Sequence, residues 1–269
     1  MLFLIRATIT RTLTAVILCI LLVPFSKSEN ASKRTVHVFV ALADNQNQGI
    51  VPVPQRLGNG LDPAHNLYWG ASAGVKTFFA RSSEWVLLNC GENPKRAILE
   101  RCAFKHRNSE TYLIADAYRG DEIRQTILDF LEAAAGADPE TITVAYAGDA
   151  VKLSVAGGSN VVAYVGHDGL MDFPLPLLHH KRTDAHRDAI ILACASKRYF
   201  AEPLRASGAC PLLWTTGLMA PEAYTLKSAL DGWIAGDSNQ QIRARAAAAY
   251  DRHQKCGSRA ALRLFATAW

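Results

Sequence analysis

The feature that most constrains the fold is a set of uninterrupted apolar runs. Residues 160–165 (NVVAYV) and 189–193 (AIILA) carry no charged side chain, and the earlier run 35–42 (TVHVFVAL) carries none apart from the possible charge of its histidine. Runs of this length and composition are typical of central strands in a parallel sheet, which helices cover on both faces. The three runs therefore predict a buried, strand-based core.

Other strands and helices alternate along the chain. Ile123, Ile127 and Phe130 recur at helical spacing within a helix expected over 121–135, which Gly136 ends. This alternation predicts an α/β fold, a three-layer α/β/α sandwich with a mostly parallel central sheet. Further strands are expected at 84–89, 111–117, 141–146, 151–155 and from 211 to 214. Further helices are expected at 66–80, at 94–106 with Pro94 in its first turn, at 221–234 and at 239–253.

The N-terminus has a different character. Residues 1–14 contain arginines and no acidic residue, and 15–25 (AVILCILLVPF) form an apolar run followed by small and polar residues. This pattern predicts a signal peptide over residues 1–28, and hence an exported, periplasmic or secreted, protein. The alternative is a retained membrane anchor, but the run is shorter than the roughly 20 residues of a spanning helix. Residues 29–269 contain no repeat or linker and are expected to form a single domain.

The charge of the chain changes when the predicted signal peptide is removed. The formal net charge falls from +5 to +2, because Arg6, Arg11 and Lys27 are lost and no acid is lost with them. No basic patch large enough for nucleic acid remains. We therefore expect no nucleic-acid partner and, after cleavage, no stable membrane insertion.

Five cysteines remain after residue 28. An odd number leaves at least one thiol that is free or paired with another molecule. Pairing Cys90 with Cys102 and Cys210 with Cys256 would leave Cys194 free, although other pairings fit equally well. A disulfide is in keeping with an oxidising compartment.

Two polar side chains follow the two most apolar runs. His167 comes after 161–165 within Gly166-His167-Asp168-Gly169, and Cys194 comes directly after 189–193. If these strands are parallel neighbours at roughly 4.8 Å, the imidazole and the thiol meet at the carboxyl edge of the sheet. A thiolate attacks acyl carbons, a nearby imidazole transfers protons, and backbone N–H groups stabilise the oxyanion. The pair therefore predicts nucleophilic acyl transfer.

This order of motifs resembles the caspase–legumain–gingipain group of cysteine peptidases. In that group an apolar strand ends in His-Gly and a later one ends in Ala-Cys, which here match 161–165 with His167 and Gly169, and 189–192 with Ala193-Cys194. The resemblance implies a caspase-like sandwich, a cysteine endopeptidase with a His–Cys dyad, a peptide or protein substrate and no cofactor. It implies that His167 is the general acid/base, Cys194 the nucleophile and the Gly169 N–H an oxyanion donor.

One residue departs from the family pattern. Asp168 stands between His167 and Gly169, where the family has His followed directly by Gly. The backbone N–H of Asp168 is therefore a second candidate for the oxyanion donor. The same departure motivates an alternative function, a catalytically inactive domain of this fold that serves binding or the structure of an envelope assembly.

Substrate-binding candidates come from the loops that build the pocket in that family. By this resemblance the loops are 44–48 and 215–217, which contain Asp44, Thr215 and Thr216. Asp44 or Asp116 would pair with a basic substrate side chain, and the alternative is that each is a solvated acid in a loop. Trp214, like Trp69, either lines a cleft or packs in the core.

Three other patterns are set aside. His179, His180 and His186 lack the tight spacing of a zinc motif and lie among basic residues, so no metal site is expected. Residues 157–160 (GGSN) precede a strand, which indicates a turn and not a phosphate-binding loop. A serine-type α/β hydrolase is disfavoured because the chain has no Gly-x-Ser-x-Gly elbow.

Overall fold

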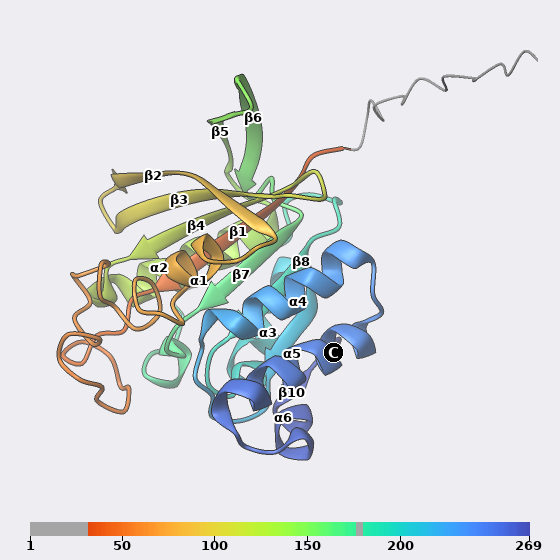
Figure 1. Ribbon diagram of the computed structural model, residues 1–269. Coiled ribbons are helices and arrows are strands. Elements are labelled where there is room, and N and C mark those ends of the chain that lie inside the picture. The colour runs from red at the N-terminus through yellow and green to blue at the C-terminus, as the bar shows by residue number, and fades with distance from the viewer. Residues whose placement is uncertain (1–31, 176–179) are drawn as a thin grey trace, which may run out of the picture. The chain divides into compact units, whose positions relative to one another are not determined.

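A mixed sheet runs through the protein. In this computed structural model, which describes residues 32–175 and 180–269, it has eight strands in the order β10-β9-β8-β7-β1-β4-β3-β2 (Figure 1). The predicted signal peptide, residues 1–28, lies outside the described residues. The strands are β1 (Arg34–Ala41), β2 (Trp85–Lys95), β3 (Ile98–His106), β4 (Thr111–Tyr118), β7 (Val161–Val165), β8 (Asp188–Leu192), β9 (Cys210–Thr215) and β10 (Phe265–Ala266).

The centre of the sheet is parallel. Strand β1 pairs in parallel with β4 on one side and β7 on the other, and β7, β8 and β9 continue in parallel. Strands β2, β3 and β10 pair antiparallel at the two edges. The central strands are buried along almost their whole length, which agrees with their uninterrupted apolar sequences.

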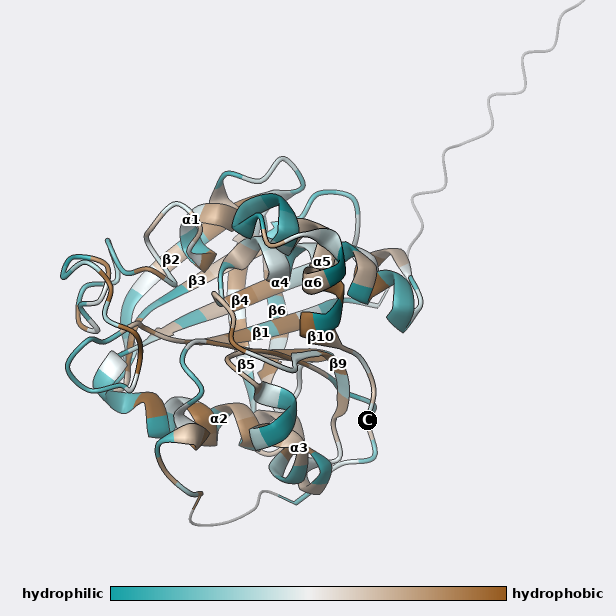
Figure 2. Cartoon of the chain, turned by 90° about the horizontal axis from the view of Figure 1, so that it is seen from below, coloured by the Kyte–Doolittle hydropathy of each residue, from teal (hydrophilic) through white to brown (hydrophobic). Residues whose placement is uncertain are grey.

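Helices cover both faces of this sheet. Figure 2 shows α1, α4 and α5 on one face, and α2 and α3 on the other. Each helical layer has its own apolar core against the sheet, with Phe79 and Leu230 in the first and Phe130 and Phe200 in the second. The α/β sandwich expected from the sequence is thus present. The helices are α1 (Val75–Ala80), α2 (Ile123–Ala135), α3 (Ser196–Ser207), α4 (Ala223–Ala235), α5 (Asn239–Gln254) and α6 (Ser258–Leu264), with 3-10 turns η1 (Gly120–Glu122) and η2 (Gly169–Met171).

Residues Ser32–Trp269 form one compact unit by their internal contacts. Among the helices described, none combines the length and the apolar character needed to cross a membrane.

Two helix predictions are wrong. The segment 94–106 is not a helix: Pro94 lies near the end of β2, and Ile98–His106 form β3, antiparallel to β2. In β3 buried and partly buried residues alternate at first, and sheet pairing prevails over the helix-start preference of Pro94. The helix expected at 66–80 is restricted to Val75–Ala80. Residues before it form turns, in which a Cβ on Gly70 would lie 2.1 Å from the carbonyl oxygen of Ala64.

The two short strands expected around the Gly148 turn are confirmed. They are β5 (Pro139–Tyr146) and β6 (Asp149–Ala156), which pair only with each other in a separate two-stranded sheet. Val144 and Leu153 of this hairpin pack against Tyr112 of β4. The residues 157–160 that follow form a turn, as expected, and Asn160 Oδ1 accepts a hydrogen bond from the Thr35 N–H at 2.8 Å.

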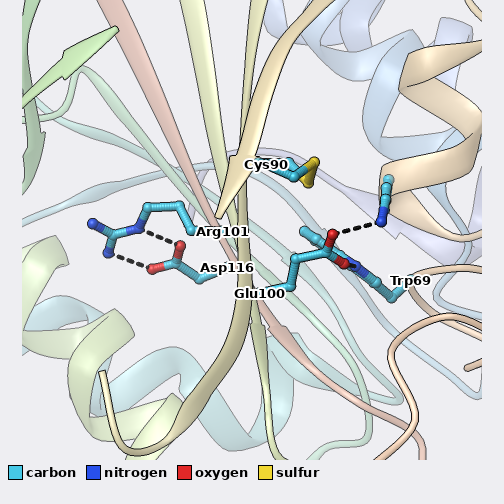
Figure 3. The surroundings of a disulfide bond; sticks show 7 residues. Trp69, Cys90, Glu100, Arg101 and Asp116 are labelled. Carbon is cyan, nitrogen blue, oxygen red and sulfur yellow. Dashed lines mark hydrogen bonds and ion pairs between the residues drawn. A yellow bond between two sulfur atoms is a disulfide. The ribbon is translucent and has the colours of Figure 1, made fainter. Parts of the chain in front are cut away.

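A disulfide joins β2 to β3. It links Cys90 and Cys102, which is one of the pairings considered from the sequence (Figure 3). Arg101 and Asp116 lie on one side of the sheet here, and Glu100 and Trp69 lie on the other. The second pairing considered, Cys210 with Cys256, is not formed, since both are free and exposed.

Candidate active site

The paired strands β7 and β8 bring His167 and Cys194 to matching positions. Val165 of β7 is the register partner of Leu192 of β8, and the Gly166 N–H donates to the Leu192 carbonyl at 3.2 Å. His167 and Cys194 each stand two residues beyond this pair, at the carboxyl edge of the sheet. Both side chains line one cavity of about 360 Å³. The two strand ends are therefore neighbours, and both side chains border the same cavity.

His167 is held in place by a carboxylate. Its side chain is 8% exposed, and its Nε2 lies 2.7 Å from Oδ2 of Asp172. The backbone of the same residue is fixed as well, because the Tyr164 hydroxyl donates to the His167 carbonyl at 2.6 Å. Asp172 also accepts from the Gly49 N–H at 3.3 Å, which connects the histidine to the loop after β1. A carboxylate on one ring nitrogen fixes the orientation of an imidazole and stabilises its protonated form.

Cys194 lies in the turn between β8 and α3. The next residue, Ala195, has the left-handed conformation with φ of 48°, which is unfavourable for a residue with a Cβ. The thiol is partly exposed and free. Its Sγ lies 3.5 Å from the Met219 carbonyl oxygen and 3.4 Å from the Met219 nitrogen. The sulfur is thus at the surface of the cavity, beside the loop that follows β9.

Hydrogen bonds of Thr215 and Ser196 fix the backbone of that turn. Thr215 Oγ1 donates to the Ala193 carbonyl and accepts from the Ser196 N–H at 3.1 Å. Ser196 Oγ in turn accepts from the Thr215 N–H at 3.0 Å and donates to the Ile191 carbonyl at 2.9 Å. Both side chains are fully buried. Thr215 therefore positions the cysteine turn, and it does not line the cavity.

The backbone N–H groups of Gly169 and Asp168 were predicted as oxyanion donors, and the N–H of Cys194 lies at the same edge of the sheet. The Gly169 N–H donates to the His167 carbonyl at 3.1 Å and is therefore occupied. Within residues 32–175 and 180–269, the N–H groups of Asp168 and Cys194 have no hydrogen-bond acceptor. Of these two residues only Cys194 lines the cavity, because Asp168 is fully buried. The Cys194 N–H is therefore the candidate donor to an oxyanion in this conformation.

Asp168 is fully buried at the start of the turn η2. Its Oδ1 accepts from the Leu170 N–H at 3.0 Å, whereas its Oδ2 has no partner among the described residues. Burial raises the pKa of Asp168 to about 7, the hydrogen bond from Leu170 lowers it, and the charge of Asp172 raises it. The inserted aspartate thus carries a structural role, as the cap of the turn that follows His167.

The expected acidic substrate contacts do not line the cavity of His167 and Cys194. Asp44 is buried, and its carboxylate accepts from the N–H groups of Gln46 and Asn47 at 2.8 and 3.2 Å. Asp116 is fully buried between Arg101 and His37. Although its burial raises the pKa of Asp116, the contacts with His37 and Arg101 hold it below its usual value.

The other residues considered as substrate contacts, Thr216 and the two tryptophans Trp214 and Trp69, do not line the cavity either. Thr216 donates from Oγ1 to the Arg263 carbonyl at 2.8 Å, so its hydroxyl is bonded to the end of α6. Trp214 is fully buried and packs edge-on against Trp269 at 5.3 Å between ring centroids. Trp69 is fully buried too, with its Nε1 donating to Glu100 at 2.6 Å. For both tryptophans core packing is the role observed.

The structure describes some, but not all, of the three histidines that were considered as metal ligands. His179 lies outside the described residues, and His186 pairs with Asp188 at 3.0 Å. Across the part of the chain that the structure describes, the only three-residue group with metal-ligand spacing is Cys90, Glu100 and Cys102. The two sulfurs of that group are joined in the disulfide.

Comparisons of this chain with protein-family models, with characterised proteins and with solved structures found no match. The sequence singled out His167 and Cys194 because both follow apolar strands. It did not single out Asp172, whose only signal was its place five residues after the histidine, and it missed Tyr68 and the loop 218–221, which also line the cavity.

Proposed function

We propose that the protein is an exported cysteine endopeptidase of the caspase–legumain–gingipain type. The observation that carries the proposal is that His167 and Cys194 stand at matching positions beyond two adjacent parallel strands and line the same cavity. The carboxylate of Asp172, bonded to His167 Nε2, adds a third group. In this arrangement Cys194 is the nucleophile, His167 is the base and Asp172 is the acid that orients the base.

In the proposed reaction the Cys194 thiol gives its proton to His167, and the sulfur attacks the carbonyl carbon of a peptide bond. The N–H group of Cys194 stabilises the oxyanion. The carbon–nitrogen bond then breaks, and the imidazolium of His167 gives its proton to the leaving amine. Water next attacks the thioester with His167 as base, which releases the carboxylic acid and restores the thiol.

The test is cleavage of a mixed peptide library by the purified protein, with products identified by mass spectrometry. Cys194→Ala and His167→Ala are expected to lose cleavage by at least 100-fold. Cys210→Ala and Cys256→Ala are the matched controls, because both remove a free, exposed thiol outside the cavity. They are expected to cleave as the unaltered protein does.

The second candidate function is the inactive binding domain. It draws on the inserted Asp168 and on the contacts that the Cys194 sulfur makes with Met219. No cleavage by the unaltered protein, with peptides bound intact, would favour this function over catalysis.

A further inference from the structure

The walls of the cavity beside Cys194 are apolar. Besides His167, Cys194 and the backbone of two glycines, the cavity is lined by the loop after β1, by Leu67 and Tyr68, by Met171 and by the loop after β9. The side chains that these segments contribute include Ile50, Val51, Val53, Leu218, Met219 and Pro221. None of the lining residues is Lys, Arg, Asp or Glu.

Several of these apolar side chains are exposed to solvent. Val51 is 86% exposed, Leu218 is 76% exposed and Met171 is 43% exposed. Exposed apolar side chains that gather around one hollow mark a ligand-binding surface more often than isolated ones do. All three line the cavity that Cys194 also lines.

The two acids predicted to bind a basic substrate side chain are engaged outside the cavity. Asp44 is bonded to its own loop, and Asp116 is bonded to Arg101 and His37. Asp172 follows the lining residue Met171, and its Oδ2 is bonded to His167 Nε2 and the Gly49 N–H. A basic substrate side chain placed in this cavity would find no carboxylate among the lining residues, and an acidic one would find no lysine or arginine there. A charged group that loses water without a partner binds poorly.

Tyr68 supplies a polar group without charge. Burial raises the pKa of Tyr68 far above its usual value, and the nearby Cys194 and Glu222 add to the shift, so the phenol stays neutral. The volume of about 360 Å³ is at the lower end of the roughly 300–1,000 Å³ typical of ligand pockets. There is room for one bulky side chain next to the sulfur.

We infer that this cavity is a specificity pocket for an uncharged, bulky apolar side chain, such as that of leucine, methionine or phenylalanine. The side chain belongs to the residue that contributes the carbonyl attacked by Cys194, so the inference rests on the proposed function. It replaces the basic preference that Asp44 and Asp116 suggested from sequence.

The first test compares peptides that differ only in the residue on the carbonyl side of the cleaved bond. Leucine or phenylalanine at that residue is expected to give a kcat/KM at least about 100-fold above lysine, aspartate or asparagine. Leu218→Asp introduces a carboxylate at an exposed position of the lining and is expected to reduce the leucine-to-lysine ratio at least tenfold. Leu61→Asp is the matched control, since Leu61 is 52% exposed in a loop outside the cavity.

The second test separates the pocket from catalysis. Fluorescence polarisation measures the binding of the same peptides to Cys194→Ala, with and without Leu218→Asp. Preferred binding of the leucine peptide, lost with Leu218→Asp and kept with Leu61→Asp, supports the pocket even if the unaltered protein cleaves nothing. Preferred cleavage after a charged residue overturns the pocket and leaves the peptidase proposal standing. Neither cleavage nor selective binding overturns both.

Discussion

Asp172 is the residue that sequence reasoning missed and that the site depends on most directly. It orients the ring of His167 through Nε2 at 2.7 Å and ties the histidine to Gly49. Substitution of such an orienting carboxylate usually lowers turnover more than it lowers stability, especially where the side chain is 40% exposed. Asp172 is thus a positioning residue in the proposed reaction.

For Asp172→Asn we expect kcat to fall about 100-fold with little change in KM, because the amide no longer stabilises the imidazolium. Steady-state kinetics on a leucine peptide measure both constants. Thermal unfolding should be almost unchanged. A loss of activity that follows a loss of folded protein would show that Asp172 has only a structural role.

Asp168 links the stability of the protein to pH. In the folded state its carboxyl has a pKa of about 7, whereas an unfolded aspartate titrates near 3.8. Between these values the folded protein binds more protons than the unfolded chain, so this residue makes stability fall as pH rises from about 4 to about 7. Over the whole window the loss is at most about 4 kcal/mol.

Asp168→Asn is expected to remove this loss, because asparagine can still accept from the Leu170 N–H and carries no charge. Urea unfolding at several values between pH 4 and pH 8 measures the difference. The variant should gain free energy of unfolding relative to the unaltered protein as the pH rises. Two parallel stability curves would contradict the assignment.

At the scale of elements, the turn between β8 and α3 is held by hydroxyl groups. The pair Thr215 and Ser196 joins the end of β9 to the start of α3, beneath Cys194. The sequence placed Thr215 near the site, but as a contact for substrate. The sequence does not show that Thr215 is buried against this turn, because the contact depends on how β9 pairs with β8 in the assembled sheet.

Thr215→Val should destabilise the protein by about 2–3 kcal/mol, because the Ser196 N–H and the Ala193 carbonyl lose a buried partner. Thr215→Ser keeps the hydroxyl and should cost less than about 1 kcal/mol. Chemical denaturation compares the two variants. If valine and serine have the same effect, the hydroxyl network does not stabilise the turn.

The disulfide belongs to the hairpin of β2 and β3, at the opposite edge of the sheet from β9 and β10. Replacing both cysteines with serine should cost about 3 kcal/mol of stability, as expected for a bond that closes a short loop. Peptide cleavage at a temperature where the variant is folded should be unchanged. A parallel loss of activity would mean that the hairpin positions the site.

The strands that carry the site were predictable because they are apolar without interruption. The segment 94–106 was not, because Pro94 is compatible with a helix start and only pairing with β2 makes Ile98–His106 a strand. The helix predicted at 66–80 was too long for a related reason. Residues 66–74 form turns, which the apolar content of the segment does not indicate.

At the scale of the molecule, the site lies where an open α/β sheet is expected to bind ligands. Strand β1 stands between β4 and β7, so the chain moves in opposite directions on the two sides of β1. The loops after β1, β7, β8 and β9 all reach the same cavity. The edge of the sheet was therefore predictable, whereas the apolar character of the cavity depends on side chains from loops whose paths the sequence did not indicate.

The central claim is that His167 activates Cys194. The most direct measurement is the rate at which iodoacetamide labels each free cysteine, followed by mass spectrometry in the unaltered protein and in His167→Ala. Cys210 and Cys256 are internal controls, because their labelling rates show whether the activity of the reagent or the folding of the protein has changed. If His167 activates Cys194, we expect His167→Ala to slow the labelling of Cys194 at least tenfold and to leave the other two rates unchanged. Equal labelling of Cys194 in both proteins would contradict it.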